Sequence, residues 1–326
     1  ATMAGHACSG FHHDRRDERG VRCPHPTSTV QPRGRGVTQS AFALPRMGLA
    51  SSYGASAVEV DEAFERGVRF FFWGAMRRRG FGRALRRLAR AHAGELVLAV
   101  QSFTSRPALV RLSVESARLR LGVDVLDVLC LAYRNGALAP GVVDAARALV
   151  RRGVVRTLMV SSHDRPTLVA LAADSAFDSL MVRYNAAHRG AESAVFPAAR
   201  AHGRRVLAYT ATRWGSLLDP ASLPPDEPRP RGSDCYRFVL SHPDVTSCLF
   251  GPADRDEMIE ALAAIERGPM SADELAWMAR VGDAVRAHVR AAPPLGPRDW
   301  LRHARGMARS IREHGVTEDL LSRFNR

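Results

Sequence analysis

The 326-residue sequence predicts a (β/α)8 barrel, and three observations support that prediction. Eight short apolar runs alternate with amphipathic segments over about 220 residues. The runs are almost continuously apolar, which is typical of parallel strands that are covered on both faces. The GxGxxG turn expected after the first strand of a doubly wound open sheet, the alternative fold, is absent.

Each predicted strand is followed by a helix, as the crossovers of a parallel barrel require. The strands are predicted over residues 42–49, 68–73, 96–101, 125–131, 155–161, 179–182, 204–209 and 246–250. The helices are predicted over residues 57–66, 82–93, 109–119, 142–151, 167–173, 194–202 and 235–240, with another that runs through Ala264. Two further amphipathic helices are predicted over residues 271–289 and 298–324.

These patterns divide the chain into three parts. Residues 1–40 lack apolar periodicity and are rich in Gly, Pro, Ser, Thr, Arg and His, so we expect a disordered leader. Residues 41–290 form the predicted barrel, and residues 291–326 form a C-terminal helical tail. The leader holds histidines and cysteines, but their spacing fits no zinc pattern, so we expect no metal site.

The charge composition excludes several kinds of chemistry. The chain has 47 basic and 33 acidic residues, a net charge of +14 and a pI near 10.9, and every one of the basic residues is an arginine. Without lysine there is no Schiff-base catalysis, no pyridoxal-phosphate attachment and no phosphate-binding loop of the GK[ST] type. Acidic residues are spread among the arginines, so we expect no nucleic-acid partner despite the high pI.

One dense group of arginines lies between Arg77 and Arg90. We expect residues 83–90 to form a solvated helix face and only residues 77–79 to reach a binding pocket. The five cysteines form no CxxC pair, and no apolar run reaches the length of about 18 residues that a membrane span needs. We therefore expect a cytoplasmic protein without a membrane segment.

Several stretches along the predicted barrel resemble, in their order and spacing, the aldo-keto reductase family. They are Gly67–Phe71, Arg111–Asp127, Leu149–Ser162, Tyr184–Asn185, Ala208–Tyr209 and Phe250–Pro252. The similarity spans residues 42–290. It implies a (β/α)8 barrel that acts as a nicotinamide-dependent carbonyl reductase.

The resemblance also implies a catalytic tetrad of Asp, Tyr, Lys and His, and this sequence departs from it at all four positions. Phe72 replaces the aspartate, Gln101 the lysine and Ala132 the histidine. The loop that would carry the tyrosine, residues 76–80, contains none. Because phenyl, amide and methyl side chains cannot act as general acids, the proton relay of the family is missing.

The positions that the resemblance assigns to the coenzyme are better preserved. Ser161 and Ser162 stand where the family has a serine and an asparagine that hold the nicotinamide carboxamide. Tyr209, followed by Thr210, stands where an aromatic ring stacks on the nicotinamide. Arg255, at the start of the last barrel helix, is the candidate phosphate ligand, although carboxylates surround it. We expect NADP or NAD as the coenzyme, with no choice made between them.

Polar residues just after the strands are candidates to replace the tetrad, because the chemistry of such barrels sits at the carboxyl ends of the strands. His163 and His188 are the candidate proton donors; the alternative is that His163 caps a helix and His188 bonds backbone in its loop. Arg213 is a candidate to stabilise an oxyanion, but it is a poor proton donor. We expect Trp214 to close the barrel mouth and Trp73 to narrow the pocket.

Two kinds of function remain. The first is an oxidoreductase of the aldo-keto reductase type, dependent on NAD(P)H, that acts on an unidentified small carbonyl or alcohol substrate through a non-standard active site. The alternative is a catalytically inactive barrel that binds a nucleotide or a protein partner. A lyase or hydrolase has no support, since the sequence shows no metal triad and no paired-carboxylate motif.

Overall fold

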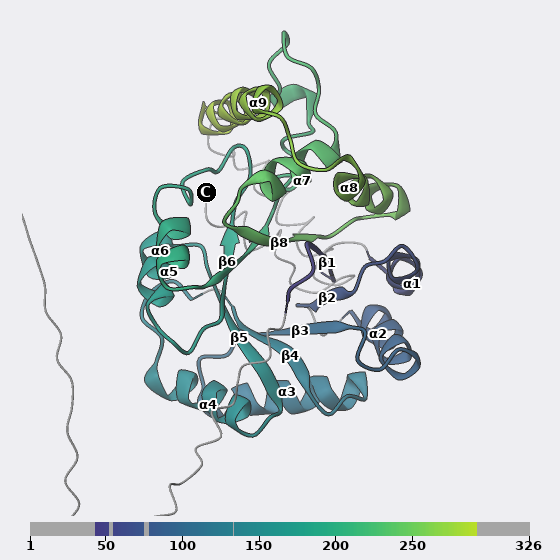
Figure 1. Ribbon diagram of the computed structural model, residues 1–326, viewed down its shortest axis with the longest axis vertical. Coiled ribbons are helices and arrows are strands. Elements are labelled where there is room, and N and C mark those ends of the chain that lie inside the picture. Colours follow the sequence, from purple (N-terminus) through teal and green to yellow (C-terminus); the bar gives the residue numbers. More distant parts are fainter. Residues whose placement is uncertain (1–42, 52–54, 75–77, 133, 292–326) are drawn as a thin grey trace, which may run out of the picture. The chain divides into compact units, whose positions relative to one another are not determined.

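Eight parallel strands, taken in sequence order, close into a barrel in which β1 pairs with β8 (Figure 1). The computed structural model describes residues 43–51, 55–74, 78–132 and 134–291, which belong to one compact unit that begins at Ala43. The predicted fold is therefore confirmed. The predicted leader, residues 1–40, and the helix predicted over 298–324 lie outside the described residues.

Strands and helices alternate as the sequence predicts. The strands are β1 (Met47–Ala50), β2 (Phe70–Trp73), β3 (Val97–Ser102), β4 (Leu126–Leu131), β5 (Val155–Ser162), β6 (Ser179–Arg183), β7 (Arg205–Tyr209) and β8 (Val245–Phe250). The helices are α1 (Ala57–Glu65), α2 (Arg79–Ala91), α3 (Pro107–Leu121), α4 (Pro140–Arg151), α5 (Arg165–Ala172), α6 (Val195–Ala201), α7 (Gly232–Ser241), α8 (Arg255–Arg267) and α9 (Ala272–Ala291). A short 3-10 helix, η1 (Pro220–Ser222), lies in the loop before α7.

The first strand begins at Met47, five residues later than predicted. Pro45 has no N–H to contribute to a strand ladder. Its carbonyl instead accepts a hydrogen bond from Ser247 Oγ at 2.6 Å, and the Arg46 guanidinium donates to the Val245 carbonyl at 2.6 Å. These side-chain contacts join the segment before β1 to β8, beside the backbone bond that Cys248 N–H donates to the Arg46 carbonyl at 2.9 Å.

Alternate residues of the strands pack into two separate cores. In β2, Phe70 and Phe72 point into the barrel, whereas Phe71 and Trp73 belong to the layer between the sheet and the helices. Trp73 lies against Gly82 of α2, where a Cβ would stand 2.4 Å from the indole ring. The prediction that Trp73 narrows the pocket is therefore wrong, because the two-residue period of the strand turns it outward.

Side chains at the helix ends explain why several helices begin and end where they do. Ser56 and Glu59 form a capping box at the start of α1, and the Asp164 carboxylate accepts from the backbone of the first turn of α5. Pro107 opens α3, and Gly122 ends it in the left-handed conformation (φ +70°). The helices thus return the chain to the amino ends of the strands and leave the carboxyl ends for longer loops.

Helix α9 packs against α7 and η1, on the outside of the barrel (Figure 1). It also approaches the loop after β6 closely, because a Cβ at Gly282 would stand 2.2 Å from the Ala186 carbonyl oxygen. In the same loop, Arg189 donates to both carboxylate oxygens of Asp283 at 2.9 Å. Helix α9 therefore belongs to the wall around the carboxyl ends of the strands. None of the helices that the structure describes is long and apolar enough to cross a membrane.

Candidate active site

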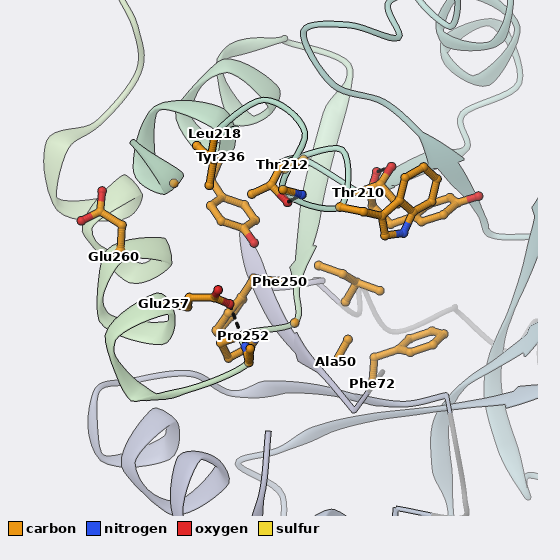
Figure 2. A pocket seen from close by; sticks show the side chains of 18 of the residues that line it. Ala50, Phe72, Thr210, Thr212, Leu218, Tyr236, Phe250, Pro252, Glu257 and Glu260 are labelled. Carbon is orange, nitrogen blue, oxygen red and sulfur yellow. Dashed lines mark hydrogen bonds between the residues drawn. The ribbon is translucent and has the colours of Figure 1, made fainter. Parts of the chain in front are cut away.

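A cavity of 630 Å³ begins at the carboxyl ends of the strands and extends outward between the loop after β7 and helices α7 and α8. Figure 2 shows Ala50 and Phe72 at one end of this cavity and Glu257 and Glu260 of α8 at the other, with Tyr236 of α7 between them. The carboxyl ends of the strands are where barrels of this kind bind ligands. This cavity is therefore the candidate active site.

The positions of the expected catalytic tetrad hold no ionisable side chain where the structure describes them. Phe72 is 1% exposed and lines the cavity, and Ala132 is buried directly after β4. Gln101 is 3% exposed, and its Nε2 has no hydrogen-bond partner among the described residues. Met76 and Arg77, in the loop that would carry the tyrosine, lie outside the described residues.

The two serines that end β5 point to opposite faces of the sheet. Ser161 pairs in register with Met181, which lines the cavity, and its buried Oγ has no hydrogen-bond partner in the described part of the chain. Ser162 Oγ donates to Asn135 Oδ1 and accepts from the backbone N–H of Asp164, both at 2.9 Å. A buried hydroxyl without a partner costs about 1–3 kcal/mol, so Ser161 is the serine that a ligand would stabilise.

Tyr209 and Thr210 line the cavity where β7 ends. Thr210 has a left-handed backbone (φ +62°), and its Oγ1 donates to the Tyr209 carbonyl at 2.6 Å. The Asn185 side chain holds this conformation: its Nδ2 donates to the Thr210 carbonyl at 2.9 Å, while its Oδ1 accepts from the backbone N–H of Ala187 at 3.1 Å. Sequence analysis placed Asn185 only within a family stretch and missed this positioning role.

The same loop contains two more residues with left-handed backbone, Arg213 and Trp214, both with φ of +52°. Each such residue costs on the order of 1–3 kcal/mol when it is not glycine, and strain of this kind clusters at ligand sites. Trp214 lines the cavity, and the Arg183 guanidinium lies 4.6 Å from the centre of its ring. The loop thus brings an arginine and an indole to the mouth of the barrel.

His163 lies directly after β5, and its ring centre is 6.2 Å from that of Tyr209. Burial and the charge of Arg183 lower the pKa of His163 below its usual range, so the imidazole is neutral at pH 7. Its alternative role as a helix cap is wrong, because Asp164 is the residue that caps α5. The prediction that His163 donates a proton concerns chemistry and stays a prediction.

His188 lies in the loop after β6, where the charges of several arginines act on it. Burial and the charges of Arg183, Arg165, Arg286 and Arg213 lower the pKa of His188 to about 3. Its backbone N–H donates to the Asn185 carbonyl at 2.8 Å. The alternative interpretation, in which the His188 side chain bonds backbone in its loop, stays a prediction. As far as the structure describes the chain, neither histidine lines the cavity itself.

Arg255, the predicted phosphate ligand, faces helix α1. Its guanidinium forms two contacts with the Glu62 carboxylate, from Nε to Oε2 at 2.8 Å and from Nη2 to Oε1 at 2.7 Å. The start of α8 is capped by Asp254, which accepts from the backbone N–H of Glu257 at 2.9 Å. Arg255 could therefore bind a phosphate only if its ion pair with Glu62 were broken. The predicted role of Arg255 as a phosphate ligand stays untested.

The side chains that line the outer end of the cavity are acidic. Asp256, Glu257 and Glu260 all belong to the lining. Hydrogen bonds from the Ser233 side chain and backbone lower the pKa of Glu260, so this carboxylate is ionised at neutral pH. The outer end of the cavity thus offers acceptors to hydroxyl groups and repels anions.

Comparisons with known proteins agree with the fold. A family model described as aldo/keto reductase family matches residues 51–234. The holo form of aldo-keto reductase AKR11C1 from Bacillus halodurans is similar in structure, with a TM-score of 0.64 and 20% identity over 73% of this chain and 92% of that one. An aldo-keto reductase from Klebsiella pneumoniae in complex with NADPH is similar too, with a TM-score of 0.62 and 20% identity over 74% of this chain and 92% of that one.

A search of curated protein sequences finds no match to the chain. The family model, however, covers more than half of the chain and includes β2 to β7 with the loop after β7 that lines one side of the cavity. The resemblance that the sequence motifs implied is therefore confirmed. The chain belongs to the aldo/keto reductase family.

Proposed function

We propose that this protein is a nicotinamide-dependent oxidoreductase that interconverts a small carbonyl compound and its alcohol. The observation that supports this most directly is the cavity itself, which runs from Tyr209 at the barrel mouth to the start of α8. It is lined by Met181, the register partner of Ser161, whose hydroxyl has no hydrogen-bond partner among the described residues. An elongated cavity with an aromatic end and a few polar groups suits a dinucleotide. The NADPH complex of the similar Klebsiella pneumoniae reductase supports the same class of ligand.

The residues of the cavity fit NADP or NAD at the barrel end. When bound, the coenzyme supplies the hydride. Ser161 Oγ would hydrogen-bond the nicotinamide carboxamide, the Tyr209 ring would pack on the nicotinamide, and Phe72 with Met181 would exclude water from beneath it. At the outer end, acidic side chains suit ribose hydroxyl groups better than an additional phosphate.

Reduction adds one hydride and one proton to the carbonyl, so the site needs an acid. Phe72, Gln101 and Ala132 cannot supply it, and His188, with a pKa of about 3, is neutral throughout the physiological range. His163 is the donor that we propose, with Arg213 stabilising the developing oxyanion. Because the pKa of His163 is lowered, its protonated form accumulates only below pH 6.5, and reduction is expected to be slow at pH 7.

A pH profile tests the role of His163. Reduction by the wild type should accelerate as the pH falls below 6.5, whereas His163→Asn should be slower by about 10²–10⁴ at low pH and should lose this dependence. His202→Asn, which changes an exposed histidine at the end of α6, is the matched control and should behave as wild type. An unchanged profile in His163→Asn would exclude it as the proton donor.

Transfer of deuterium distinguishes an oxidoreductase from an inactive barrel. The protein would be incubated with coenzyme deuterated at the nicotinamide C4 and with a panel of aldehydes and ketones, and the alcohols would be analysed by mass spectrometry. We expect deuterium on the carbinol carbon of at least one product. Coenzyme binding without any transfer across the panel would contradict the proposed activity and favour a nucleotide-binding role.

A further inference from the structure

Four arginines from different segments act electrostatically on His188, which lies in the loop after β6. Arg165 begins α5, Arg183 ends β6, Arg213 lies in the loop after β7, and Arg286 lies on α9. All four charges act on the same imidazole. Positive charges gathered in this way repel one another and attract anions.

The backbone places the side chains of this arginine cluster by specific contacts. Arg183 stands opposite Tyr209 in the β6–β7 register, at a position that points into the barrel mouth, with its guanidinium 4.6 Å from the ring centre of Trp214. The Arg165 guanidinium lies over Gly190, where a Cβ would stand 2.5 Å from Nη1. Arg183 thus lies against an indole ring, and Arg165 lies against the backbone of a glycine.

Two further features bring the remaining arginines to the same place. Arg213 is held in a left-handed conformation (φ +52°), which a non-glycine residue adopts only at a cost. Arg286 lies one helical turn after Gly282, whose missing side chain lets α9 approach the loop after β6. A strained backbone therefore positions Arg213, and the close packing of α9 positions Arg286.

Three carboxylates on or beside these segments have contacts of their own. Asp164 caps α5, Asp283 binds Arg189 at 2.9 Å, and Glu192 accepts a hydrogen bond from the Tyr184 hydroxyl at 2.6 Å. The acidic residues that line the cavity lie at its opposite end, on α8. The arginine cluster and the acidic end therefore face different parts of a bound ligand.

The arginine cluster adjoins the barrel end of the cavity. Trp214 lines the cavity on one side and contacts Arg183 on the other, and Tyr209, which also lines it, is paired with Arg183 in the sheet. A second, independent observation at the same end is the fully buried Ser161 hydroxyl, which has no partner within the described part of the chain. A ligand at this end would meet both hydrogen-bond donors and positive charge.

We propose that Arg165 and Arg183, beside His188 and with the added positive charge of Arg213, form an anion site that binds the carboxylate or phosphate group of the substrate. The proposal deepens the oxidoreductase function proposed above. It rests on that function, because the anion is a substrate only if the protein is an oxidoreductase. Guanidinium groups bind both anions through paired, charge-assisted hydrogen bonds, and the planar fork favours oxygens in one plane. The substrate class is thus an anionic aldehyde or ketone, and its neutral analogue is expected to be poor.

Binding of inorganic phosphate tests the anion site without coenzyme or turnover. By calorimetry at constant ionic strength, the wild type should bind phosphate, and Arg183→Gln should weaken binding at least tenfold. Arg83→Gln, on the exposed face of α2, is the matched control and should bind as wild type. No binding, or binding unaffected by Arg183→Gln, would overturn the site.

His188 gives a second measurement that needs no variant. The NMR signals of its ring should move on titration with phosphate but not with chloride, and its pKa should rise from about 3 as the anion offsets the arginine charges. The signals of exposed His202 should stay unchanged. If the ring signals of His188 do not shift when phosphate is added, the proposal is contradicted.

Paired substrates then separate this proposal from the proposed function. With coenzyme present, kcat/KM for 4-carboxybenzaldehyde should exceed that for 4-methylbenzaldehyde at least tenfold, and Arg183→Gln should abolish this preference. Equal values for the two aldehydes in the wild type would overturn the anion site as a substrate site while the oxidoreductase function stands. Phosphate binding that depends on Arg183, with neither aldehyde reduced, would support the anion site and contradict the oxidoreductase function.

Discussion

Replacing Ser161 by alanine should change stability and coenzyme binding in opposite directions. In the protein without ligand, the Ser161 hydroxyl is buried and has no hydrogen-bond partner among the described residues. Alanine removes this polar atom and leaves the strand position otherwise unchanged. The free protein should therefore become more stable, whereas a coenzyme whose carboxamide uses the hydroxyl should bind less tightly.

The magnitudes follow from the cost of an unsatisfied hydroxyl and the value of a neutral hydrogen bond. The free energy of unfolding should rise by about 1 kcal/mol, which corresponds to roughly 2–4 °C in Tm for a chain of this size. Loss of one neutral hydrogen bond, about 0.5–1.5 kcal/mol, should raise the Kd of the coenzyme about two- to tenfold. Thermal unfolding and a fluorescence titration of NADPH measure the two effects on the same samples.

Ser162→Ala is the matched control, one residue along the same strand. Its Oγ donates to Asn135 Oδ1 and accepts from the Asp164 backbone, so its loss should destabilise the protein by about 1 kcal/mol or more. It points away from the cavity, so coenzyme affinity should stay close to wild type. A Ser161→Ala protein that is less stable, or that binds coenzyme as tightly as wild type, would refute the reasoning.

Three other predictions concern packing, coenzyme choice and acid stability. Gly82→Ala should destabilise the fold by about 1–3 kcal/mol in urea unfolding, because its Cβ would stand 2.4 Å from the Trp73 ring. Asp256→Asn should lower the Kd of NADPH about two- to fivefold and change that of NADH little, because one repulsive charge leaves the outer end of the cavity. Hydrogen bonds from Arg237 lower the pKa of Glu274 to about 2, so its contribution to stability is present above pH 4.5 and lost as the pH falls towards 2. Glu274→Gln should therefore flatten the decline in urea midpoint over that interval.

The glycine and aspartate predictions each have a control within the chain. Gly80→Ala introduces the same methyl group in α2 with open space around it, 4.0 Å from the nearest atom, and should leave stability equal or higher. Asp273→Asn removes an exposed carboxylate of α9 and should not alter the ratio of the NADPH and NADH affinities. Equal losses in both glycine variants, or equal changes in both aspartate variants, would contradict the assigned causes.

The alternation of apolar runs predicted the barrel because closure of parallel strands leaves few alternatives, but it could not assign faces. In residues 70–73 every side chain is aromatic, so no polar residue marks which ones face the barrel. Phe72 was placed correctly because the family motif fixes its position, whereas Trp73 was placed on the wrong side. The Ser161–Ser162 pair shows the same limit, since both are serines and only the register decides which one adjoins the cavity.

Features that depend on distant residues were beyond sequence analysis. Arg255 pairs with Glu62, a residue from the first helix of the barrel, and the spacing of the two in sequence says nothing of this contact. The left-handed conformation of Arg213 and Trp214 occurs without the glycine that usually marks it. The arginine cluster likewise combines residues from four segments, including α9, which the family motifs do not reach.

Titration of the purified protein with NADPH and NADH, followed by coenzyme fluorescence at low and moderate salt, tests the central claim most directly. We expect saturable binding that persists at moderate salt and weakens at least tenfold in Tyr209→Ala, because the ring that lines the barrel end of the cavity is lost. Binding that disappears with salt would be attraction to a chain of net charge +14. That result, or no binding of either coenzyme at millimolar concentration, would contradict the assignment of the cavity.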